Sequence, residues 1–291
     1  MISSVFKGFI FVLLVTQSSF EAEHRAWREK RNAELRMEDG WLAVAGLSWL
    51  KEGSNSMGTG KNMNVVLPPG SAPENVGTLE LASGVVTLHV ADGVVVKVGN
   101  QAVRTHEMRF DGDKQPASFL VGSLKLSVIK RGQRFGLRVR DKNSEALREF
   151  KGLRWFPARE SYRVVATFTP DEKPREIIIM NVLGDELKMK SPGVLSFQLN
   201  DRTYQLRPVM ENDEKLFIIF RDRTAGKTTY GAGRYLYAAL PKDGKVVLDF
   251  NRAENPPCAF TPYATCPLPP RQNFLPIPIP AGERAFHLKT K

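Results

Sequence analysis

The sequence predicts a mainly β fold, with sandwich- or barrel-like antiparallel sheets, one N-terminal helix and a proline-rich C-terminal wrap. Three observations predict it. From Gly40 to about Val209, short runs of Val, Leu, Ile and Phe are broken by Gly, Asn, Asp and Pro, as in strands joined by turns. The predicted strands include Val85–Val90, Tyr162–Phe168 and Glu176–Val182. Residues 21–37 are instead rich in Ala, Glu, Arg and Lys, which favour helices. Nine prolines crowd between Pro256 and Pro280.

The N-terminus is predicted to be a secretory signal peptide of residues 1–19. Lys7 precedes a short apolar run from Gly8 to Thr16, and small residues follow up to Ser19, in the order of an export signal. The run is shorter than the roughly 20 residues that a membrane-spanning helix needs. An uncleaved N-terminal membrane anchor is the alternative. We therefore expect an exported protein, periplasmic or extracellular, with no stable membrane span after signal cleavage.

The rest of the chain is predicted to fold in three parts. Residues 20–39 form the N-terminal helix, which Asp39-Gly40 brings to a stop. A polar stretch that begins at Arg140 separates a first β unit, 40–148, from a second β unit, 149–291. The two units could equally be halves of one body. Near the C-terminus proline fixes φ and supplies no amide donor, so this segment should wrap over the surface without joining a sheet.

The chain contains two cysteines, Cys258 and Cys266. In an oxidising compartment such a pair is expected to form a disulfide, which here would close a short loop. Its stabilisation should lie at the low end of about 2–4 kcal/mol, because the loop is short. A two-thiolate metal site is the alternative, but no histidine lies nearby in sequence to complete it. We therefore expect neither a metal nor another cofactor.

The charge balance is basic, since 42 Lys and Arg against 31 Asp and Glu give a formal net charge of +11. These cations are spread along the chain, without zinc-finger spacing or an aromatic RNA-binding motif. We interpret the charge as a solvated surface and expect no nucleic-acid partner. An unknown small molecule or an envelope protein is the expected partner.

Known catalytic motifs are missing from the sequence. It has no G-x-S-x-G elbow, no H-E-x-x-H and no EF-hand loop. The four histidines are scattered along the chain. One of them stands beside a carboxylate, in His106-Glu107, and we interpret this dipeptide as a surface pair rather than as part of a site.

The most distinctive motifs lie between Arg221 and Glu283. They are TAGKTTYGAGR, which ends at Arg234, DFNRAENPPCAFTPYATCPLPP, which begins at Asp249, and AGE, which ends at Glu283. These motifs resemble the C-terminal signature of a bacterial family known as domain of unknown function 1684. Earlier segments fit the same pattern: GWL at Gly40, GLSWL at Gly46, GLRWFP at Gly152 and NVLG at Asn181. The resemblance covers most of the mature chain and implies a common fold, but no established activity.

Six polar residues of this region are candidates for a ligand-binding site: Asp249, Asn251, Asn255, Arg234, Tyr230 and Tyr263. Asp249 ends an apolar strand, where a carboxylate needs a partner such as Arg234 or Arg252. The asparagines offer donors and acceptors, and the tyrosines offer an apolar face with a polar tip. The equally coherent alternative is structural, with Asp249 and Asn251 binding the backbone of the wrap.

Three classes of function follow from these residues. We favour an exported protein that binds a polar small molecule or glycan through its C-terminal face. A hydrolase is an alternative, with Asp249 or Glu283 as general base and Arg234 stabilising an anion. A structural or assembly module of the cell envelope is the other. Whether the protein is an enzyme is left open by the sequence.

Overall fold

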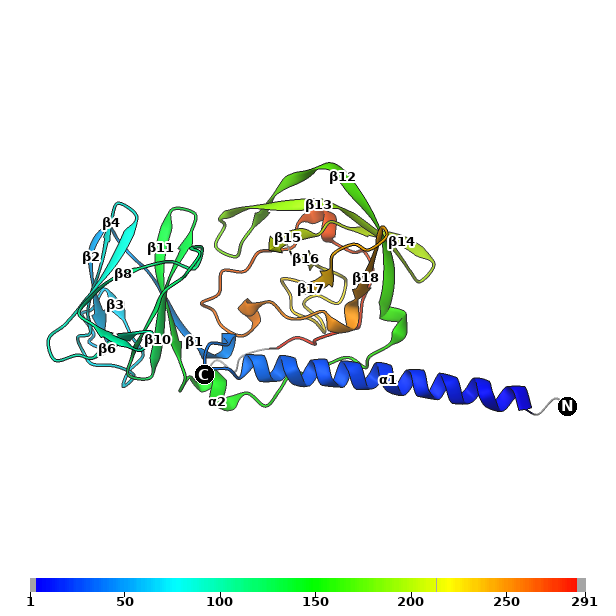
Figure 1. The fold of residues 1–291 in the computed structure, drawn as a ribbon, viewed down its shortest axis with the longest axis horizontal. Coiled ribbons are helices and arrows are strands. Elements are labelled where there is room, and N and C mark those ends of the chain that lie inside the picture. Colours follow the sequence, from blue (N-terminus) through cyan, green and yellow to red (C-terminus); the bar gives the residue numbers. More distant parts are fainter. Residues whose placement is uncertain (1–3, 213, 287–291) are drawn as a thin grey trace. The chain divides into compact units, whose positions relative to one another are not determined.

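The computed structural model describes residues 4–212 and 214–286, and it is mainly β, as the sequence predicts (Figure 1). The chain divides into two compact units. Unit 1 comprises the described residues up to Glu34, residues 152–259 and those from Thr265 onward, and unit 2 comprises residues 35–151 and 260–264. The short segment 260–264 therefore belongs to a different unit from its two flanks.

Unit 2 consists of two sheets that enclose one core. The strand order is β1-β11-β10-β9-β6-β7 in the first sheet and β3-β2-β4-β5-β8 in the second. Leu79 and Leu88 of one sheet pack in the same core as Leu126 and Leu137 of the other. The strands are β1 (Val44–Trp49), β2 (Gly53–Gly58), β3 (Val65–Val66), β4 (Gly77–Ala82), β5 (Val85–Val90), β6 (Val96–Val98), β7 (Gln101–Val103), β8 (Thr105–Met108), β9 (Ser118–Val121), β10 (Leu124–Arg131) and β11 (Arg134–Asp141), followed by the short helix α2 (Glu145–Glu149).

Unit 1 also encloses its core between two sheets. One has the strand order β14-β13-β12-β18 and the other β15-β16-β17. Leu195 and Phe197 of the first sheet share the core with Ile218 and Phe220 of the second. The strands are β12 (Arg163–Met180), β13 (Glu186–Leu199), β14 (Arg202–Leu206), β15 (Val209–Asn212), β16 (Lys215–Phe220), β17 (Arg234–Ala239) and β18 (Lys245–Asp249).

The sequence suggests separate strands at 162–168 and 176–182, but β12 runs through both as one strand and pairs with β13 in a long hairpin. The pairing of the two strands shifts register between Pro170 and Arg175. Proline cannot donate to a ladder, so strands accept it at bulges and edges. One strand therefore passes through the polar segment that the sequence shows as a break.

The N-terminal helix α1 (Ser4–Leu35) runs through both the predicted signal segment and most of the predicted helix 20–39. It ends ahead of Asp39-Gly40, where the chain continues as turns. Within unit 1, the Trp27 ring meets Trp155 edge-on at 5.3 Å. Among the described residues, none of the helices combines the length and the apolar character of a membrane span.

After β18 the described chain forms short 3-10 turns and isolated bridges in place of further strands. Side chains replace the missing ladder: Asn273 accepts from the Arg207 amide and donates to the carbonyls of Arg207 and Ile219. Gly282 has φ +78°, and a Cβ there would lie 2.3 Å from the Ala253 oxygen. This close approach requires glycine and explains the middle residue of the AGE motif.

Candidate ligand-binding site

Asp249, the first predicted site residue, is the centre of a buried polar cluster in unit 1. It ends β18, directly opposite Arg163 at the start of β12. One carboxylate oxygen accepts from His24 Nε2 at 2.9 Å and from Arg163 Nε at 2.9 Å. The other accepts from the backbone amide and the side-chain amide of Asn251. The second nitrogen of His24 faces the Phe20 carbonyl at 2.8 Å.

The cluster holds Asp249 ionised. Burial alone would raise the pKa of this carboxyl, but the hydrogen bonds of Asn251 and the charges of His24 and Arg163 outweigh it, and the pKa lies below its usual value. Arg163 and Arg252 are bridged by Glu23 of α1, which binds both guanidinium groups. A carboxylate with so many internal donors is a weak base. It serves as a structural anchor between α1, β12 and β18.

A second buried cluster surrounds Glu283, which is fully buried. Its carboxylate accepts from Arg31 Nε at 3.0 Å and from the Asn255 amide at 2.7 Å. Arg31 also meets Glu254 at 3.3 Å. Burial raises the pKa of Glu254 to about 7, against the charge of Arg31, and burial likewise raises the pKa of Glu283. One arginine of α1 thus holds two carboxyl groups of the C-terminal wrap.

The third cluster explains the motif that ends at Arg234. The guanidinium of this fully buried arginine binds Asp222 at 3.1 Å and the Ile279 carbonyl at 3.0 Å. Asp222 also accepts from the Thr224 hydroxyl, which in turn contacts the Thr229 hydroxyl at 2.8 Å. Arg234 therefore pairs with Asp222 and not, as the sequence suggests, with Asp249.

The two predicted tyrosines lie in different units. Tyr230 belongs to unit 1, where its hydroxyl donates to the Cys258 carbonyl at 3.1 Å, and burial raises its pKa. Tyr263 belongs to unit 2, in the segment where the Thr261 hydroxyl donates to the Val44 carbonyl. Five of the six predicted residues are in unit 1, where they belong to separate hydrogen-bond networks, and Tyr263 is in unit 2.

The predicted disulfide is not present in the structure. The Cys258 amide donates to the Cys266 sulfur at 3.1 Å, and the two thiols are hydrogen-bonded to each other. The two cysteines are adjacent, but the predicted covalent bond between them is not shown. This hydrogen bond and burial both raise the pKa of the Cys266 thiol, which keeps it protonated. No group of metal-ligating side chains occurs in the described ranges.

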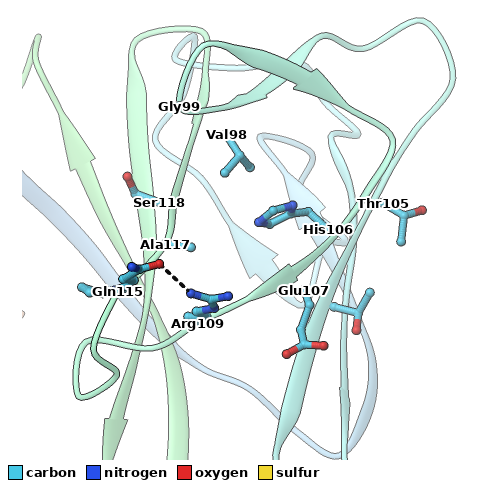
Figure 2. A pocket seen from close by; sticks show the side chains of 11 residues that line it. Val98, Gly99, Thr105, His106, Glu107, Arg109, Gln115, Ala117 and Ser118 are labelled. Atoms are coloured by element: carbon cyan, nitrogen blue, oxygen red, sulfur yellow. Dashed lines mark hydrogen bonds between the residues drawn. The ribbon is translucent and has the colours of Figure 1, made fainter.

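A polar groove in unit 2 was not anticipated from the sequence as a site. It has a volume of about 950 Å³ and lies beside the edge strand β8, the β6–β7 turn and the segment that leads into β9 (Figure 2). Its lining comprises Thr87, Val98, Gly99, Thr105, His106, Glu107, Arg109, Gln115, Pro116, Ala117 and Ser118. The volume is in the range of small-molecule sites.

The side chains of the groove have few internal partners. Arg109 donates to Gln115 at 3.1 Å, the contact drawn in Figure 2. In the described part of the chain, the side chains of His106 and Glu107 make no hydrogen bond or ion pair, and both are at least partly exposed. Figure 2 shows the His106 ring between Val98 and Arg109. These groups are therefore available to a ligand.

A second hollow of about 480 Å³ continues the groove. It shares Glu107, Arg109 and Gln115 with the first and adds Asp113 and Lys114. The two hollows therefore share one wall, formed by Glu107, Arg109 and Gln115. The only signal in the sequence was His106-Glu107, since hydroxyl and amide residues in short strands do not form a motif.

Comparisons with known proteins concern mainly unit 1. Residues 148–284 match the family model described as "Protein of unknown function (DUF1684)". The chain belongs to this family. The solution NMR structure of an uncharacterized protein of Haloarcula marismortui is 36% identical, and the match covers 47% of this chain and 78% of that chain with a TM-score of 0.41. A search of curated proteins gives no match. The DUF1684 region contains the central carboxylates of the three buried clusters, Asp249, Glu283 and Asp222, whereas their α1 partners and the groove residues precede it.

Proposed function

We propose that this DUF1684 protein binds a polar, hydroxyl-rich ligand, a small molecule or glycan, in the groove beside β8. The observation that carries the proposal is that polar side chains line an open hollow without being used by the fold. The lining includes the hydroxyl groups of Thr87, Thr105 and Ser118, the amide of Gln115 and the ring of His106, which lies on the opposite face of β8 from Thr105. Such groups offer both donors and acceptors to a ligand.

The charges of the groove favour a neutral ligand. Glu107 and Arg109 contribute one carboxylate and one guanidinium, which balance each other. A groove of balanced charge gives no net attraction to an ion, while its polar groups can bind hydroxyls through direct or water-mediated hydrogen bonds. A neutral oligosaccharide is therefore the ligand class that we favour.

The proposal keeps polar-ligand binding but moves it away from the C-terminal face. The hydrolase alternative has less support, because Glu283 is fully buried and the pKa of Asp249 is lowered, which makes it a poor base. The three clusters of unit 1 support a structural role of these residues within the fold, since their charged groups bind mainly one another and the backbone.

The test is a titration of the protein with neutral di- to tetrasaccharides, followed by saturation-transfer NMR of the sugars. We expect transfer to at least one sugar with the wild type and with His89→Ala, and little with His106→Ala. His89 is a matched control, because it pairs with Glu80 at 3.3 Å and does not line the groove. Equal transfer with all three proteins, or none with the wild type, would contradict the proposal.

Export is part of the proposed function. The segment Lys7 to Ser19 has the order of a signal peptide. We expect the periplasmic or secreted fraction to contain a chain that begins close to Phe20, as read by N-terminal sequencing. Recovery of the full-length chain from the cytoplasm alone would contradict export, and recovery of the full-length chain in the membrane fraction would favour the uncleaved anchor.

We also propose that the two cysteines form a disulfide in an oxidising compartment. Thiol–disulfide exchange with a disulfide oxidant would transfer two electrons to the oxidant and release two protons, and the S–S bond would form between Cys258 and Cys266. Their hydrogen bond supports this proposal. Mass spectrometry of protein from its native compartment should find no alkylatable thiol before reduction, and two labelled thiols would contradict it.

A further inference from the structure

A row of cations crosses the other sheet of unit 2, the one that contains β6, β9, β10 and β11. Lys125 of β10 is directly opposite Arg140 of β11 on one side and Leu120 of β9 on the other, and Leu120 is opposite Lys97 of β6. Residues directly opposite on neighbouring strands share a face of the sheet. Three cations and one exposed leucine therefore stand in one line.

Like charges opposite each other destabilise a sheet unless something compensates for them. In the described part of the chain, Lys125 and Arg140 form no ion pair with a carboxylate. The nearest charges that act on Arg140 are those of Asp39 and Asp111, and burial still lowers the pKa of this guanidinium. The direct contact of Arg140 is with the Asp39 backbone, whose carbonyl accepts from Nε at 3.1 Å.

A hollow of about 460 Å³ lies over this pair of cations. Lys142 adds a third cation to its wall, while Glu38 and Asp39 add two carboxylates. Met37 and Leu120 supply apolar surface. With Nε held by the Asp39 carbonyl, the other guanidinium nitrogens of Arg140 are left for a ligand, and a planar fork of donors suits an oxyanion.

The geometry points to a second ligand site, which binds a phosphate group between Lys125, Arg140 and Lys142. A tetrahedral dianion can accept from all three side chains, and it would neutralise the repulsion of the opposed pair. The group can come from inorganic phosphate or from a phosphorylated organic molecule, such as a sugar phosphate, whose carbon skeleton would contact Met37 and Leu120. This site is independent of the proposed groove.

The test is the melting temperature of the full chain in low-millimolar phosphate against chloride at matched ionic strength, with a hexose phosphate as a third arm. We expect phosphate to raise the wild-type melting temperature and that of Lys51→Ala, an exposed lysine outside the hollow. Lys125→Glu should be unresponsive. A larger response to hexose phosphate than to inorganic phosphate assigns the group to an organic ligand.

Lys125→Glu also separates loss of binding from loss of folding. It replaces a repulsive cross-strand pair by an attractive one, so its melting temperature in chloride should equal or exceed that of the wild type. A phosphate response that is the same in wild type and Lys125→Glu would reduce the effect to general salt stabilisation and overturn the proposal. No response in the wild type would overturn it as well.

Discussion

The two units use their polar residues in opposite ways. In unit 1 the charged side chains of the family motifs are buried in ion pairs, as Arg234 is with Asp222 and Glu283 is with Arg31. In unit 2 the polar side chains beside β8 surround an open groove and have few partners. The comparison teaches that the most distinctive motif of the chain specifies its fold, while the residues of the proposed ligand groove form no motif.

The largest expected effect comes from breaking the buried ion pair of unit 1. Arg234→Ala should lower the free energy of unfolding by about 3–5 kcal/mol, because Asp222 is left as an unpaired buried charge. Urea unfolding followed by circular dichroism measures the change. Arg202→Ala, on the exposed edge of β14, is the control and should stay within about 0.5 kcal/mol of the wild type. Equally small changes in the free energy of unfolding for Arg234→Ala and Arg202→Ala would contradict the structural role of Arg234.

Removing Asp249 should have the next largest effect. Asp249→Ala leaves His24 and Arg163 without their acceptor and should cost about 2–3 kcal/mol, less than the Arg234 change because Arg163 is partly exposed. The pKa of Asp249 is lowered in the folded state, so its contribution is complete above the unfolded carboxyl pKa of about 3.9 and is lost as the pH falls. The stability difference between wild type and variant should therefore shrink below about pH 4. A constant difference down to pH 2 would contradict this assignment.

Glu254 should respond to pH in the other direction. Its folded pKa, about 7, lies above the unfolded value of about 4.3, so the wild type loses stability as the pH rises between these values. Glu254→Gln does not titrate and should show a shallower decline from pH 4 to 8, by about 1–2 kcal/mol. Glu172→Gln, an exposed residue of β12, is the matched control. Parallel pH profiles for wild type and Glu254→Gln would show that burial does not raise the pKa of Glu254.

The smallest effect on stability is expected in the groove. His106→Ala and Arg109→Ala should each change the free energy of unfolding by less than about 0.5 kcal/mol, because both side chains are partly or fully exposed. Each should still weaken oligosaccharide binding by about tenfold or more, which isothermal titration measures. A loss of stability comparable to that of Asp249→Ala would place these residues in the fold and not in a site.

The sequence predicts the β fold well, because strand periodicity and turn residues are local signals. Val85–Val90 is predicted as a strand with the bounds that β5 has in the structure. β12 is predicted in two pieces, because its register shift beside Pro170 depends on pairing with β13. The helix α1 begins at Ser4, upstream of the predicted start at residue 20. The apolar signal segment also favours a helix, so composition alone could not place the start.

The candidate site was harder to predict, since ion pairs depend on residues far apart in the chain. The partners of Asp249 and Glu283 are His24 and Arg31 of α1, more than two hundred residues earlier in the sequence. No spacing rule connects such residues. The motif density around Asp249 therefore indicated importance correctly, but the distinction between a binding face and a buried network needed the three-dimensional arrangement.

The central claim is that ligand binding resides in the groove of unit 2 and not in the motif region of unit 1. It is tested most directly by comparing oligosaccharide binding to His106→Ala and Asp249→Asn at a temperature where both are folded. The account predicts that Asp249→Asn melts earlier but binds like the wild type, whereas His106→Ala melts like the wild type but has lost binding. Intact binding by His106→Ala together with lost binding by folded Asp249→Asn would contradict it and return the site to the C-terminal face.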